Sequence, residues 1–117
     1  MTNHSIGIIG NPDRTGITDA LDMLLRSLKE FRPKRCILAS DVQSIVREGS
    51  CEFMEDHYDI ARQSDVIFAL GGDGTMLGAS RAIMRANPNC RLLGINLGKL
   101  GFIAENPPEI IPRLVEA

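Results

Sequence analysis

The sequence predicts an open, mostly parallel α/β sheet with flanking helices. Short apolar runs rich in β-branched residues alternate along the chain with segments whose apolar residues recur at helical spacing. The run at 66–70 is the clearest example, since it breaks into glycines and then opens a helical segment. Strands that alternate with helices are typically joined by right-handed crossovers and therefore run parallel. The 117 residues suffice for one domain around one core.

The first strand and the first helix are clearly marked. Residues 5–10 form an apolar run that stops at the turn signal Asn11-Pro12-Asp13. Thr18 is the expected N-cap of the next helix, because its hydroxyl can accept a bond from the first turn. The run Phe31-Arg32-Pro33 ends this helix. The apolar residues of the helix fall on one face, at Leu21, Leu24, Leu25 and Leu28.

The region between this helix and the central glycines is less regular. Residues 35–39 fit a second strand. Ser40-Asp41-Val42-Gln43 has capping-box spacing and predicts a short helix. No element is predicted for residues 51–58. Residues 59–64 suggest a short helix before the strand at 66–70.

The last part of the chain predicts two more helices and one more strand. Thr75 is the expected N-cap of a helix that stops at Asn87-Pro88-Asn89. Residues 91–95 form a fourth strand, and a glycine-containing loop follows at 96–105. A final helix opens at residue 106 and runs out without a C-cap, so we expect more protein beyond it.

Charge and composition argue against several classes of function. Thirteen basic and fifteen acidic residues give a net charge of −2, so no nucleic-acid partner is expected. No apolar stretch approaches the ~18 residues of a transmembrane helix. No signal peptide is recognisable, and we expect a cytoplasmic protein without a membrane partner. The three cysteines, Cys36, Cys51 and Cys90, lack metal-ligand spacing and are expected to be buried free thiols in a reducing compartment.

The strongest functional signal is the junction Gly71-Gly72-Asp73-Gly74-Thr75. A strand that breaks into glycines and opens a helix is where α/β proteins hold phosphates. We therefore expect Gly71, Gly72, Gly74 and Thr75 to bind phosphate, with the glycines allowing a close approach and unusual φ. Asp73 would repel a bare phosphate, which indicates chemistry or metal binding. A tight turn, with Asp73 merely favouring the helix start, is the alternative on local grounds.

Three strand exits are expected to share one edge of the sheet. They are Gly10-Asn11-Pro12, the glycine junction at 71–75 and the loop at 96–102. Ligands of parallel sheets bind outside the carboxyl ends of the strands. The Walker pattern and the dinucleotide pattern Gly-x-Gly-x-x-Gly are both absent, so neither familiar phosphate motif applies.

The junction at 71–75, placed after an apolar strand, resembles a kinase superfamily that contains NAD kinases, diacylglycerol and sphingosine kinases, and phosphofructokinases. The string at 94–103 resembles the second motif of the NAD kinases, and residues 6–12 resemble their first strand and turn. The resemblance is strongest from 66 to 104. It implies that residues 1–117 are the amino-terminal α/β domain of an NAD kinase-like fold. The second, β-rich domain of that family is missing from this chain.

The resemblance also implies a reaction and its participants. An NAD kinase transfers a phosphoryl group to the 2′-hydroxyl of the adenosine ribose of NAD and produces NADP. ATP or polyphosphate is the expected donor, with a divalent ion, Mg²⁺ or Mn²⁺. Asp73 would be the catalytic carboxylate, acting either as a base or as a metal ligand, and the metal ligands stay undefined. Asp73, Gly74, Leu77 and Phe102 would contact NAD. A homo-oligomer is expected.

Alternatives stay open for the function and for two of these residues. A lipid kinase of the diacylglycerol or sphingosine type is one, although the loop at 96–102 argues against it. A non-catalytic nucleotide-binding or oligomerisation module is another, which the missing second domain favours. Phe102 could be an ordinary core residue, and Leu77 is expected to be shared between core and pocket. The isolated chain is expected to be a weak or inactive catalyst.

Overall fold

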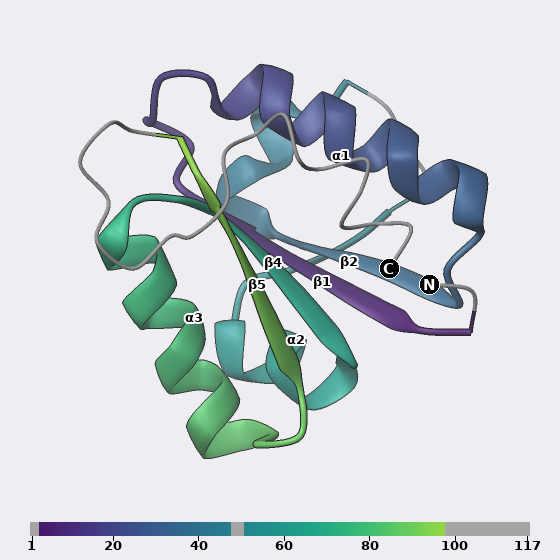
Figure 1. Ribbon diagram of the computed structural model, residues 1–117, viewed down its shortest axis with the longest axis vertical. Coiled ribbons are helices and arrows are strands. Elements are labelled where there is room, and N and C mark those ends of the chain that lie inside the picture. Colours follow the sequence, from purple (N-terminus) through teal and green to yellow (C-terminus); the bar gives the residue numbers. More distant parts are fainter. Residues whose placement is uncertain (1–2, 48–50, 98–117) are drawn as a thin grey trace.

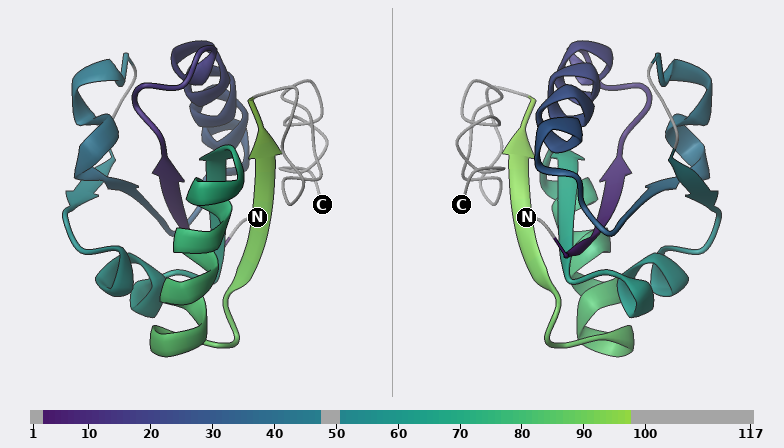
Figure 2. Two further views of the ribbon diagram at one scale, coloured as in Figure 1. Left: turned by 90° about the vertical axis from the view of Figure 1, so that its left-hand side faces the viewer. Right: turned by 90° about the vertical axis from the view of Figure 1, so that its right-hand side faces the viewer.

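Parallel strands form one sheet in the order β3-β2-β1-β4-β5 (Figure 1). The structure is a computed structural model that describes residues 3–47 and 51–97. Figure 2 shows β1, β4 and β5 pointing in the same direction, as their recorded registers require. The strands of the described residues are β1 Ser5–Gly10, β2 Arg35–Ala39, β3 Glu52–Met54, β4 Val66–Gly71 and β5 Arg91–Asn96.

Helices cover both faces of the sheet. On one face lie α1 and a short 3₁₀ helix, η1, and on the other lie α2 and α3 (Figure 1). This arrangement is the doubly wound α/β architecture that the alternating pattern predicts. The helices of the described residues are α1 Ile17–Phe31, η1 Ser40–Ile45, α2 His57–Gln63 and α3 Asp73–Ala86.

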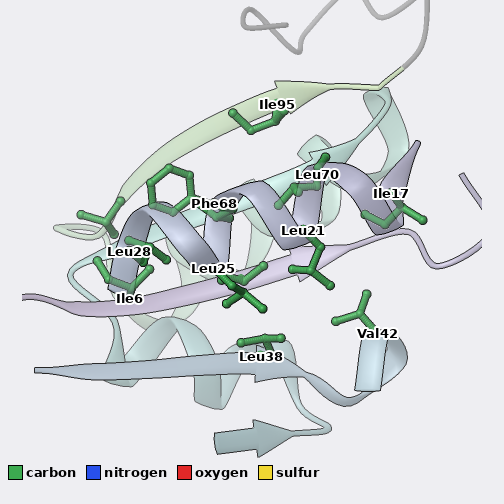
Figure 3. Packing of buried hydrophobic residues seen from close by; sticks show 14 residues of the cluster. Ile6, Ile17, Leu21, Leu25, Leu28, Leu38, Val42, Phe68, Leu70 and Ile95 are labelled. Atoms are coloured by element: carbon green, nitrogen blue, oxygen red, sulfur yellow. The ribbon is translucent and has the colours of Figure 1, made fainter. Parts of the chain in front are cut away.

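One core lies between α1 and the sheet. The predicted leucine face of α1 points at the strands, and Leu21, Leu24 and Leu28 are almost wholly buried (Figure 3). Phe68 of β4 and Ile6 of β1 meet them from the sheet. Each such side chain contributes roughly 1.5–3 kcal/mol when fully buried. This packing fixes α1, and with it the loop that joins β1 to α1.

A second core holds α2 and α3 against the opposite face. Met76 and Ala79 of α3 and Ile60 of α2 are buried there, over Ile67 and Ala69 of β4. The small side chains of Ala69 and Ala79 let α3 lie close to the sheet. Because α3 follows β4 directly, this packing sets where its first turn stands at the sheet edge.

Several boundaries differ from the predictions. Helix α1 begins at Ile17 with Gly16 as its N-cap at φ 88°, so Thr18 lies inside the helix and does not cap it. Turn bonds in the preceding loop account for this, since the Ile17 N–H already donates to the Arg14 carbonyl. Helix α3 has Gly72 as its N-cap, and Thr75 again lies inside the helix.

The segment from 40 to 63 also departs from the predictions. The expected capping box does not form, because η1 is a 3₁₀ helix without a side-chain cap bond. Strand β3 lies in the stretch for which no element was predicted, so the sheet has one strand more than the four expected. Helix α2 begins earlier than expected because Asp56 accepts a hydrogen bond from the Tyr58 N–H at 2.8 Å. The predicted final helix lies outside the described residues.

Candidate functional site

The strand order creates a switch point between β1 and β4. After β1 the chain builds β2 and β3 on one side, and then returns to place β4 on the other side of β1. A crevice at the carboxyl ends of the two strands at such a point is the usual ligand site of an open α/β sheet. The two segments that leave the sheet here are the β1–α1 loop, residues 11–16, and the predicted glycine junction, residues 71–75.

The prediction that three strand exits share one edge is confirmed for the described residues. The Asn11 N–H, just after β1, donates to the Leu70 carbonyl oxygen of β4 at 3.1 Å. The Leu97 N–H, just after β5, donates to the Gly71 carbonyl oxygen at 3.0 Å. The exits of β1 and β5 are therefore both bonded to the exit of β4. The remainder of the predicted 96–102 loop lies outside the described residues.

The glycine junction is half strand and half helix. Strand β4 ends at Gly71, Gly72 is the N-cap, and Asp73 is the first residue of α3. The first bond of the helix runs from the Met76 N–H to the Gly72 carbonyl oxygen at 3.1 Å. The N–H groups of Gly74 and Thr75 thus belong to the first turn, where a helix offers donors and the positive end of its dipole. The geometry suits an anion at this position.

The glycines of the junction serve close packing rather than unusual dihedrals. Among the described glycines, Gly16 alone has a positive φ. The expectation of unusual φ at Gly72 and Gly74 is therefore wrong. A Cβ on Gly71 would stand 2.5 Å from the Thr75 Oγ1, so the Thr75 side chain occupies that space. At Gly74 a Cβ would meet no atom within 4 Å, and the residue is exposed. Gly74 therefore leaves open space over the first turn of α3.

Arg14 is the residue that sequence reasoning missed. A Cβ on Gly72 would stand 3.1 Å from the Arg14 Nη2 and 3.2 Å from its Nη1, so the guanidinium lies against the glycine junction. The Arg14 N–H donates to the Asn11 carbonyl oxygen at 3.2 Å, which fixes its position in the β1–α1 loop. Arg14 is the sole Lys or Arg within residues 11–16, so a search for cations after strands of the shared edge would have found it.

Three of the predicted NAD-contacting residues lie together on α3. Asp73 is half-buried, and Gly74 and Leu77 are exposed. Leu77 is four residues after Asp73 and three after Gly74, which puts all three on neighbouring positions of the helix surface. Leu77 is 46% exposed, so it is not shared with the core as expected. Phe102 lies outside the described residues.

The described residues contain no ready-made metal site. Within 3–47 and 51–97 no three His, Cys, Asp or Glu side chains are grouped closely enough to hold a metal ion. Asp73 is the carboxylate of the junction itself. Mg²⁺ is commonly bound through one or two carboxylates together with substrate phosphates. A single carboxylate in the first turn of α3, where the geometry suits an anion, fits that mode of binding.

The described helices and a cavity at the far end of the sheet are two further features. None of the helices in the described ranges is both long and apolar enough to cross a membrane. A cavity of about 440 Å³ lies between the carboxyl end of α1 and the amino ends of β2 and β3. It contains none of the predicted site residues and lies at the opposite edge of the sheet from the glycine junction.

Comparison with known proteins identifies a family. A family model described as the ATP-NAD kinase N-terminal domain matches residues 6–117. The chain is 36% identical over 120 residues to the NAD kinase of Azotobacter vinelandii, a match covering 96% of this chain and 37% of that protein. It is 34% identical over 115 residues to the NAD kinase of Shewanella halifaxensis, covering 92% of this chain and 33% of that protein. The chain therefore spans about a third of the length of these curated relatives.

A solved structure has the same fold. The structure of yeast NADH kinase complexed with NADH superposes with a TM-score of 0.77 at 18% sequence identity. The match covers 99% of this chain and 38% of the yeast chain. The predicted fold class, an open parallel α/β sheet with flanking helices, is thus confirmed.

Proposed function

The chain belongs to the ATP-NAD kinase N-terminal domain family, and we propose that it carries the ribose- and phosphate-binding half of an NAD kinase site. The observation that carries the proposal is the position of the glycine junction at the β1–β4 switch point. Arg14 stands on one side of that junction, and Asp73 lies in the first turn of α3. A cation, helix N–H donors and one carboxylate are the groups that phosphoryl transfer to a hydroxyl requires.

Asp73 is the proposed catalytic residue. The 2′-hydroxyl of the adenosine ribose is a weak nucleophile, so it must be held in line with the phosphoryl group. A carboxylate at hydrogen-bond distance can orient the hydroxyl and accept its proton as the bond to phosphorus forms. Asp73 stands at the start of α3 next to the open space over Gly74, where a ribose can approach. The product of the transfer is NADP.

The phosphates of the donor are proposed to lie against the start of α3 and Arg14. The first-turn N–H groups of Gly74 and Thr75 and the guanidinium of Arg14 all favour negative charge at this point. Gly72 has no side chain and so lets Arg14 stand close to the junction, while the open space for the phosphates lies over Gly74. The family description supports ATP as the donor, and polyphosphate presents the same phosphoanhydride chemistry.

A divalent ion, Mg²⁺ or Mn²⁺, is proposed to arrive with the donor phosphates. Such an ion neutralises the charge that develops on the transferred phosphoryl group. Asp73 is the residue that would hold it if its carboxylate is not used as the base. The single carboxylate of the junction matches an ion whose other ligands are phosphate oxygens and water.

The rest of the site is proposed to come from a second, β-rich domain. Residues 1–117 would be the amino-terminal domain, consistent with a chain that spans about a third of its relatives. Leu77, exposed on α3 near Asp73, would contact the dinucleotide, as would Phe102. We also propose that the protein is a cytoplasmic homo-oligomer, as expected from the sequence.

The test is a fusion of this chain to the remaining carboxyl-terminal part of the Azotobacter vinelandii NAD kinase. The fusion protein should form NADP from NAD and ATP with Mg²⁺, and the isolated chain should do so weakly or not at all. Diacylglycerol offered in place of NAD should not be phosphorylated. A folded fusion protein that binds NAD yet makes no NADP would support the non-catalytic module instead.

A further inference from the structure

Two cysteines lie side by side at the edge of the sheet opposite the glycine junction. Cys36 is the second residue of β2, and Cys51 immediately precedes β3. Their Sγ atoms are 3.2 Å apart, although the residues are 15 positions apart in the chain. Ile37 is paired with Glu52, so one step earlier Cys36 stands opposite Cys51. Both side chains pack against the core beneath α1, on the same face of the sheet.

This placement meets the geometric requirements of a disulfide. Neighbouring strands lie about 4.8 Å apart, and the Cα atoms of a disulfide are usually about 4.4–6.8 Å apart. The two side chains already point at each other from adjacent strands, so a bond needs an approach of only about 1 Å by the sulfurs. Cys36 and Cys51 are free thiols in this structure.

The two thiols differ in reactivity. The Cys51 thiol donates a hydrogen bond to the Cys36 sulfur, and this contact between the two side chains lowers the pKa of the Cys51 thiol. The same contact, together with burial, raises the pKa of the Cys36 thiol. We therefore expect Cys51 to be the attacking thiol and Cys36 to be the second thiol that follows. Cys90 is buried on the other face of the sheet, where burial raises its pKa to about 11.

A cationic cleft opens beside this pair. Cys36 and Cys51 both line the cavity of about 440 Å³ described above. Lys29, Arg32 and Lys34 also line it and are exposed. Among the described residues that line it, the carboxylate of Glu52 is already held by Arg35 through contacts of 2.7 and 2.9 Å. The cleft therefore favours a small molecule that carries negative charge.

We propose that Cys36 and Cys51 form a reversible intrachain disulfide by exchange with a small anionic disulfide that docks in this cleft. The Cys51 thiolate attacks one sulfur of the bound disulfide, which forms a mixed disulfide and releases one small thiolate. The Cys36 thiol then loses its proton to solvent, and its sulfur attacks Cys51. This step closes the protein disulfide and releases the second small thiolate, so one disulfide is consumed and one is formed.

The test uses oxidised glutathione as an anionic disulfide and cystamine as a cationic one. The reduced protein is incubated with each, the remaining thiols are blocked with maleimide, and peptides are mapped by mass spectrometry. We expect a Cys36–Cys51 disulfide that forms about tenfold faster with oxidised glutathione than with cystamine at low salt. The double variant Arg32→Gln and Lys34→Gln should remove most of that preference, because it takes two positive charges from the lining of the cleft. The variant should still fold, since both side chains are exposed.

Cys90→Ala is the matched control, and it should leave the rate and the product unchanged. Cys36→Ser should trap a lasting mixed disulfide on Cys51, since the second thiol is missing. A lasting mixed disulfide on either cysteine of the unaltered protein would overturn the intrachain bond. Equal rates with the two reagents would overturn the docking of an anionic disulfide. The mapping on the unaltered chain decides the matter even where a cysteine variant fails to fold.

Discussion

The guanidinium of Arg14 lies so close to Gly72 that a Cβ on this glycine would stand 3.1 Å from the Arg14 Nη2. This contact joins the loop after β1 to the junction after β4, and thus spans the switch point of the sheet. It brings a fixed positive charge to the start of α3, where the helix dipole already favours an anion. In the fusion protein with the carboxyl-terminal part of the Azotobacter vinelandii enzyme, the effect of this contact and its neighbours on activity can be measured.

Arg14→Gln should raise the KM for ATP about 10- to 100-fold, because hydrogen bonds to charged groups contribute about 1.5–3 kcal/mol. The KM for NAD should change much less. Arg14→Lys should recover part of the loss, since it restores the charge without the planar fork. Arg81→Gln, at an exposed position further along α3, is the control and should leave both constants unchanged. Equal loss for ATP and NAD would contradict a phosphate role for Arg14.

Asp73→Asn should lower kcat by about 10²–10⁴-fold, which is the usual contribution of a positioned general base. The change keeps the shape of the side chain, so thermal unfolding should be nearly unchanged. Glu30→Gln removes an exposed carboxylate of α1, far from the junction, and controls for the loss of one negative charge. NADP formation close to that of the parent would rule out Asp73 as base or metal ligand.

Gly74→Val should abolish nucleotide binding and leave the protein folded. A Cβ at Gly74 meets nothing within 4 Å, so the valine fits the protein but fills the space offered to the ligand. Gly78→Val is matched, because it lies one turn later on α3 and is equally open. Calorimetry with NAD should find binding in the Gly78 variant alone. Normal binding by the Gly74 variant would reduce the junction to a structural turn.

Leu77→Ala should weaken NAD binding while leaving the free energy of unfolding nearly unchanged. Leu77 is 46% exposed and so contributes little to the core. Met84→Ala, at a 71% exposed position on the same helix, should change neither quantity. A clear loss of stability with unaltered affinity would return Leu77 to a purely structural role.

Glu52→Gln should destabilise the edge strand β3 at neutral pH and not at acid pH. The hydrogen bonds from Arg35 hold the pKa of the Glu52 carboxyl below its usual value. The stabilisation is therefore present above the unfolded-state pKa and is lost as the pH falls through the folded-state pKa. Urea unfolding of parent and variant should differ at pH 7 and converge once the pH falls below the lowered folded-state pKa of Glu52. A difference that persists at acid pH would assign the effect to packing.

Most of the fold could be predicted because the long strands and the long helix carry their own local signals. Runs such as 5–10 and 66–70 are buried along their whole length and read as strands without help. Strand β3 could not be predicted, since three residues show no alternation and its pairing with β2 depends on tertiary contacts. The N-caps at Gly16 and Gly72 were missed because neither uses a side-chain bond.

In the candidate site, too, some residues could be predicted from the sequence and others could not. Asp73 and Gly74 stand out in the sequence because the junction is a contiguous motif after a strand. Arg14 does not, because its partner Gly72 is far away in the chain and only the strand order brings them together. The exposure of Leu77 likewise depends on which face of α3 packs on β4. The ligand-binding roles of these residues stay predictions.

The pairing of β1 with β4 also governs when the site can come into existence. Ile6 of β1 is paired with Val66 of β4, which the ribosome synthesises 60 residues later. β1 therefore cannot complete its pairing until β4 has been made. At about 5–20 residues per second, that interval lasts several seconds. During it, β1 has β2 on one edge and an open edge on the other, which is the kind of surface that chaperones shield. The junction and Arg14 meet only when β4 pairs with β1, so the proposed phosphate site is incomplete in nascent chains until these two central strands have paired.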